Sequence, residues 1–133
     1  MFKASLRLAG AAMAAMAIAA APMASQAAGD VLQSGTFEGA SGHATSGGVT
    51  VVSTDDGPVV VLGDDFVFDG APDPHVAFGT GGTFDPDSVL GLLISDTGEQ
   101  VYAVPASLDI SGYDEVYIWC VQYSVPLGVA ALR

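Results

Sequence analysis

The stretch VYIWCVQYSVP, residues 116–126, is rich in β-branched and aromatic residues, and that composition favours a β-strand. Alternation gives the stretch two apolar faces, with Val116, Ile118 and Cys120 on one and Tyr117, Trp119, Val121 and Tyr123 on the other. Because both faces are apolar near the middle, the pattern predicts a central strand, Val116–Ser124, covered on both sides. It also predicts that Cys120, the only cysteine of the chain, is buried.

The rest of residues 28–133 shows short runs of Val, Phe, Tyr and Thr separated by Gly-, Pro- and Asp-rich turns, and no run keeps a helical period. The further strands predicted are Ser34–Glu38, Gly48–Ser53, Val59–Leu62, Asp65–Phe68, Val76–Gly79, Leu92–Ile94, Gln100–Val104 and Gly128–Leu132. Many short strands at this spacing predict an all-β fold, a two-sheet antiparallel β-sandwich of jelly-roll or Greek-key-like type. Little or no helix is expected outside the N-terminal segment, apart from a turn at Pro86–Leu90 capped by Asp85.

The N-terminal segment has the three parts of an export signal. Lys3 and Arg7 give a positive start, Leu8–Ala21 is an uncharged, alanine-rich run, and small residues precede a cleavage point after Ala27. The run is shorter than the ~20 apolar residues that span a bilayer. We therefore predict a signal peptide at residues 1–27, a single domain at 28–133, and a periplasmic or secreted protein with no membrane anchor after cleavage.

Cleavage there leaves Arg133 as the only Lys or Arg against all fifteen Asp and Glu. So acidic a surface argues against nucleic acid and anionic lipid as partners, because both select basic patches. It favours solubility, divalent cations or a basic protein partner. The aspartates at 64, 65, 69, 73, 85 and 87 lack the spacing of a calcium loop, so a solvated acidic surface is the simplest interpretation.

An ordered set of motifs resembles one known family. The set comprises Gly35-Thr36-Phe37, His43 ahead of Gly47-Gly48-Val49, Asp65-Phe66, Gly70–Asp73 with His75-Val76, Gly98–Pro105, Tyr113–Val116, Ile118-Trp119-Cys120 and Gly128–Ala130. In order and spacing it is similar to the electron transfer DM-thirteen domain, the Skeletor- and DOMON-associated module that also occurs alone in exported bacterial proteins. The resemblance implies an all-β fold and extracytoplasmic redox chemistry at the family's characteristic cysteine, which Cys120 matches. An exported accessory redox or electron-transfer module with a redox protein partner would follow, without stand-alone catalytic activity.

Three chemistries remain open for Cys120. A reactive thiolate needs nearby cations, a metal or a helix N-terminus, and this acidic chain offers little of these. A second reading is metal: Cys120, His43 and His75 are the only soft or imidazole ligands after residue 27, and two His with one Cys form a known copper set. Haem ligated by Cys120 or a His is a related option, although no CxxCH motif is present. Each histidine also has a plain interpretation, as a turn residue or an inward-facing strand residue.

The third reading makes Cys120 a buried core residue, because free cysteine behaves as a small hydrophobe. The protein would then be a structural or adhesive binding module outside the cytoplasm. No Ser-His-Asp arrangement, phosphate-binding loop or nucleotide fingerprint supports a hydrolase or a kinase.

Overall fold

The computed structural model describes residues 29–133, and the predicted signal peptide at residues 1–27 lies outside them. The strands are β1 (Val31–Gly39), β2 (Thr45–Ser46), β3 (Gly48–Thr54), β4 (Gly57–Leu62), β5 (Val67–Phe68), β6 (Pro74–Thr80), β7 (Thr83–Phe84), β8 (Gly91–Leu92), β9 (Gln100–Ala103), β10 (Glu115–Cys120) and β11 (Val125–Ala131). A short 3-10 helix, η1 (Pro86–Ser88), follows β7.

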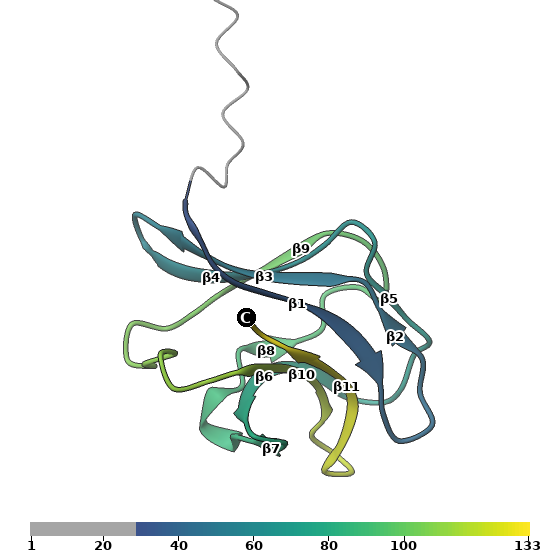
Figure 1. The fold of residues 1–133 in the computed structure, drawn as a ribbon. Helices are drawn as coiled ribbons and strands as arrows, with labels where there is room; N and C mark the ends of the chain where they lie inside the picture. The colour runs from purple at the N-terminus through teal and green to yellow at the C-terminus, as the bar shows by residue number, and fades with distance from the viewer. Residues whose placement is uncertain (1–28) are drawn as a thin grey trace, which may run out of the picture.

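Among residues 29–133, nine strands form one sheet that curls over on itself. The order is β7-β6-β10-β11-β1-β3-β4-β9, with β8 also paired to β6, and neighbouring strands in this sheet run antiparallel. In Figure 1 the strands β3, β4 and β9 form the upper layer and β6, β10 and β11 the lower one. Strand β1 pairs with both β3 and β11, so it joins the two layers. The predicted all-β sandwich is confirmed, and its two layers belong to one continuous sheet.

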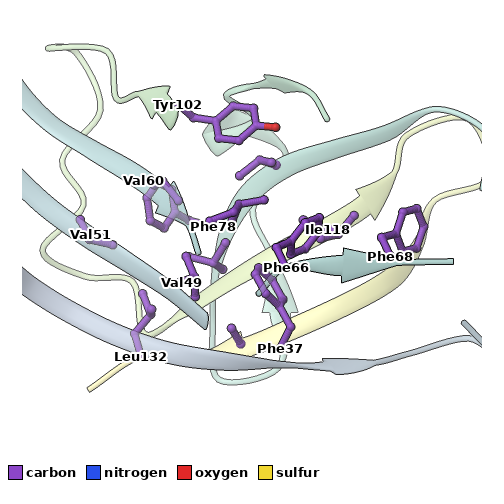
Figure 2. Close-up of a cluster of buried hydrophobic side chains, with 14 of the residues drawn as sticks. Phe37, Val49, Val51, Val60, Phe66, Phe68, Phe78, Tyr102, Ile118 and Leu132 are labelled. Atoms are coloured by element: carbon purple, nitrogen blue, oxygen red, sulfur yellow. The ribbon is translucent and has the colours of Figure 1, made fainter. Parts of the chain in front are cut away.

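The core lies between the two layers. Val51 of β3 and Val60 of β4 point into it from one side, and Phe78 of β6 and Ile118 of β10 from the other (Figure 2). Each of these four side chains is fully buried. Alternation along each strand therefore puts one apolar row inside, which is what stabilises a sandwich of this kind.

Strand β10 lies between β6 and β11, so its predicted central position is confirmed. The predicted end at Ser124 is wrong, because β10 stops at Cys120 and residues 121–124 form the turn of a hairpin. Cys120 pairs with Val125 across that turn, and Ser124 has a φ of 53°. High β-propensity in VQYS is overridden because the antiparallel pairing needs a turn here.

The outer face of the predicted strand is covered over a shorter length than expected. Tyr117 is buried and Trp119 is half-buried, whereas Val121 and Tyr123 are 43% and 62% exposed.

The predicted helical turn at Pro86–Leu90 is confirmed in a shorter form, as η1. The Asp85 carboxylate caps it by accepting from the Asp87 N–H at 2.9 Å. No helix within residues 29–133 is long and apolar enough to cross a membrane.

Candidate functional site

Cys120 is the last residue of β10 and lies on its core face. Its side chain is 1% exposed, which confirms the predicted burial. Two contacts hold the sulfur: Sγ donates to the carbonyl oxygen of Pro72 at 3.1 Å, and the Tyr123 N–H donates to Sγ at 3.4 Å. The first contact requires a proton on the sulfur, so this arrangement suits the neutral thiol.

The Pro72 carbonyl belongs to residues 69–73, the "69–73 loop", which lies against the end of β10. Asp73 has a left-handed backbone, with a φ of 55°, between Pro72 and Pro74. This conformation is one that Asp tolerates better than most residues. The Asp73 carbonyl accepts from Val121 N–H at 3.3 Å. The loop is thereby attached to the hairpin turn immediately after Cys120 and covers the sulfur.

His75 lies on β6, directly opposite Trp119 of β10, while Cys120 is opposite Pro74. Because neighbouring strand residues point to opposite faces, His75 lies on the outer face and Cys120 on the core face. The His75 Nδ1 is 3.0 Å from the Asp73 carbonyl oxygen and 3.7 Å from its carboxylate. The ring is therefore held by the 69–73 loop, on the other side of the sheet from the sulfur.

His43 contacts the opposite end of the same loop. Its Nδ1 lies 2.9 Å from an Asp69 carboxylate oxygen, and the second oxygen accepts from Ala44 N–H at 3.0 Å. The Ala44 N–H and then the His43 ring lower the pKa of Asp69, because both favour the charged carboxylate. The pair is about one-third exposed and belongs to the surface.

All three predicted ligands thus contact the 69–73 loop, at three separate places. Cys120 meets Pro72, His43 meets Asp69, and His75 meets Asp73. Within the part of the chain that the structure describes, no group of three or more His, Cys, Asp or Glu is arranged to hold a metal ion. The structure does not bring the three predicted ligands together, and metal or haem ligation by these residues stays a prediction.

Two features near Cys120 were not found by sequence reasoning. The first is the Pro72 carbonyl, which as a backbone atom carries no sequence signal. The second is Phe84 of β7, whose ring stacks on Trp119 with centroids 3.9 Å apart and an interplanar angle of 7°. The turn-forming Gly81-Gly82 pair before Phe84 was the one available sign of a strand there. Trp119 and Tyr117, which the alternation puts on the same apolar face of the strand, form an aromatic group with Phe84.

These observations define a class of protein: a small all-β sandwich with a single thiol buried at the end of a central strand. A family model described as Electron transfer DM13 matches residues 36–132, and the chain belongs to that family. The resemblance stated from the motifs is therefore confirmed, and the family description indicates a redox-related module. No curated protein and no solved structure matches the chain.

Proposed function

We propose that this protein is an exported accessory electron-transfer module whose redox centre is Cys120. The observation that carries the proposal is the position of Cys120 at the end of the central strand. Its side chain is 1% exposed, and its sulfur is hydrogen-bonded to the Pro72 carbonyl oxygen. Membership of an electron-transfer family supports it. Export rests on the predicted signal peptide at residues 1–27, and a periplasmic or secreted location follows from it.

The burial of Cys120 restricts the chemistry. A thiol exchanges with a disulfide by direct attack of sulfur on sulfur, and a covered Sγ cannot make that attack while the 69–73 loop stays in place. No second cysteine exists in the chain to form an internal disulfide. The proposed redox role therefore requires a copper or haem group, which Cys120 would help to hold and which would supply the one-electron chemistry.

The experiment compares the protein purified from its native compartment with a Cys120→Ser variant. We expect the wild type to show a redox wave in voltammetry, or a charge-transfer or Soret band, and the variant to lack it. The variant should stay folded, because a serine hydroxyl can donate to Pro72 and accept from Tyr123 as the thiol does.

Ile118→Val is the matched control, because it alters the same core face of β10 without touching the sulfur. It should keep the redox signal despite a stability loss of about 0.5–1.5 kcal/mol. A wild type with neither wave nor band would contradict the proposal, and Cys120 would then be a packing residue of a structural or adhesive module. Intact mass of the exported protein tests cleavage after Ala27.

A further inference from the structure

The outer face of the lower layer has a shallow groove of about 490 Å³, on the side of β10 opposite Cys120. Tyr117, Trp119 and Phe84 line it, together with Pro126 and Val129 of β11. The β10–β11 register puts these residues side by side, because Tyr117 lies opposite Val129 and Trp119 lies opposite Pro126. We call this feature the aromatic groove.

The aromatic side chains of the groove are held in fixed positions. Phe84 stacks on Trp119, and the Tyr117 ring stands edge-on to Trp119 at 81° with centroids 6.0 Å apart. Tyr117 also lies over Gly79 of β6, where an added Cβ would overlap its ring. The groove is therefore a preformed surface, which lowers the entropy cost of binding.

The charged side chains in and next to the aromatic groove are acidic. Glu115 lines it, the exposed Asp114 precedes Glu115 on β10, and the exposed Glu38 of β1 lies opposite Val129 in the sheet. Burial and then the charge and hydrogen bond of Glu115 raise the pKa of Tyr117 to about 12, with a further contribution from Asp114. These causes are consistent with a negative field at the groove.

No cation of the described residues neutralises that charge. Arg133 is the only Lys or Arg in residues 29–133, and the ion pairs found there involve only the two histidines with Asp69 and Asp73. His75, opposite Trp119, is the one basic group that the register puts on this face, and the 69–73 loop holds its ring. Glu115 thus has no cationic partner among residues 29–133 and can attract a cation from another molecule.

We propose that the aromatic groove binds a basic segment of a partner protein, with an Arg or Lys side chain lying along the rings and its charged head at Glu115. Such side chains match the groove because their stems pack on apolar surface while the cation meets ring faces and carboxylates. A neutral oligosaccharide matches it less well, since Glu115 Oε1 already accepts from the Gly82 N–H at 2.8 Å and the Tyr117 hydroxyl at 3.2 Å. This inference goes beyond the proposed redox function and does not depend on Cys120.

Trp119 makes the test direct, because it is the only tryptophan of the chain and lines the groove. The probe is a blocked glycine-arginine peptide, and the matched probe is the same peptide with citrulline, which keeps the shape of arginine and removes its charge. We expect the arginine peptide to change Trp119 fluorescence saturably and with an affinity that falls as salt is raised. The citrulline peptide should bind at least several-fold more weakly.

Glu115→Gln tests the position of the cation, and Asp55→Asn in the exposed β3–β4 turn is its control with the same charge change. We expect Glu115→Gln to weaken the arginine peptide roughly two- to fivefold, and Asp55→Asn to leave it within error. Equal effects of the two variants would mean general attraction to an acidic protein and would overturn the proposal. Equal binding of both peptides, or a response to cellohexaose alone, would overturn it as well.

Discussion

Replacing the sulfur of Cys120 separates its structural role from its chemical one. Sγ donates to the Pro72 carbonyl and accepts from the Tyr123 N–H, so it joins the end of β10 to the 69–73 loop. In Cys120→Ser both bonds can be kept by the hydroxyl. In Cys120→Ala both are lost. We therefore expect serine to be the less destabilising substitution, against the usual rule that a buried polar group costs more than a buried methyl.

The expected loss in the free energy of unfolding follows from the two hydrogen bonds and from the space that the sulfur fills. Loss of a buried hydrogen-bond partner costs about 1–3 kcal/mol, and the lower half of that range applies because Pro72 is exposed and water can reach it. A cavity of roughly 20 Å³ left by the sulfur adds about 0.5 kcal/mol at about 24 cal/mol per Å³. Alanine should thus cost about 1.5–2.5 kcal/mol. Serine, which keeps its bonds but is less apolar than cysteine, should cost about 1 kcal/mol.

The measurement is reversible unfolding in denaturant, followed by the fluorescence of Trp119, the neighbour of residue 120 and the only tryptophan. The difference of about 0.5–1.5 kcal/mol between the variants corresponds to a melting-temperature gap of roughly 2–12 °C in a domain of about 100 residues. A serine variant as unstable as the alanine variant, or less stable, would refute the reasoning. The two hydrogen bonds would then contribute nothing to the attachment of the 69–73 loop.

Three further outcomes are expected. Ser88→Ala should cost about 1–3 kcal/mol in the same assay, because the buried Ser88 Oγ accepts from the Phe78 N–H at 2.8 Å and lies within hydrogen-bond distance of the Phe78 and Asp85 carbonyl oxygens. The exposed Ser107→Ala should change little. Tyr113 donates to Asp85 at 2.5 Å, and this hydrogen bond is the main cause that raises the pKa of Tyr113 to about 12. Since the folded pKa lies above the ordinary tyrosine value of 10.0, the contact stabilises the fold fully below that pH and loses its effect as the pH rises through about 12. Asp85→Asn should accordingly shift the ultraviolet titration of Tyr113 back toward 10.0, and an unchanged titration would contradict the assignment. Finally, a maleimide should label Cys120 slowly in the folded protein and rapidly after denaturation; equal rates would show that the 69–73 loop does not protect the thiol.

Much of the fold is readable from local patterns. Alternation in residues 116–120 predicts the central strand and the buried thiol, and the valine-rich segments around the Asp55-Asp56-Gly57 turn predict two strands, which are β3 and β4 in the structure. Both depend on side chains within a few positions of one another, where the two-residue period of a strand applies. The family motifs added the redox interpretation that composition alone did not support. The signal peptide and export stay predictions.

The site needed information that no local pattern holds. Cys120 and the Pro72 carbonyl that binds it are 48 residues apart, and a backbone oxygen has no residue type to mark it. That His75 lies on the face away from Cys120 follows from a register between β6 and β10, since a shift of one residue would exchange the faces. The stacking of Phe84 on Trp119 depends on the same sheet pairing, because β7 joins the layer through β6. Propensity and periodicity act along the chain, whereas these contacts come from strand pairings between distant segments, and only the folded sheet brings them together.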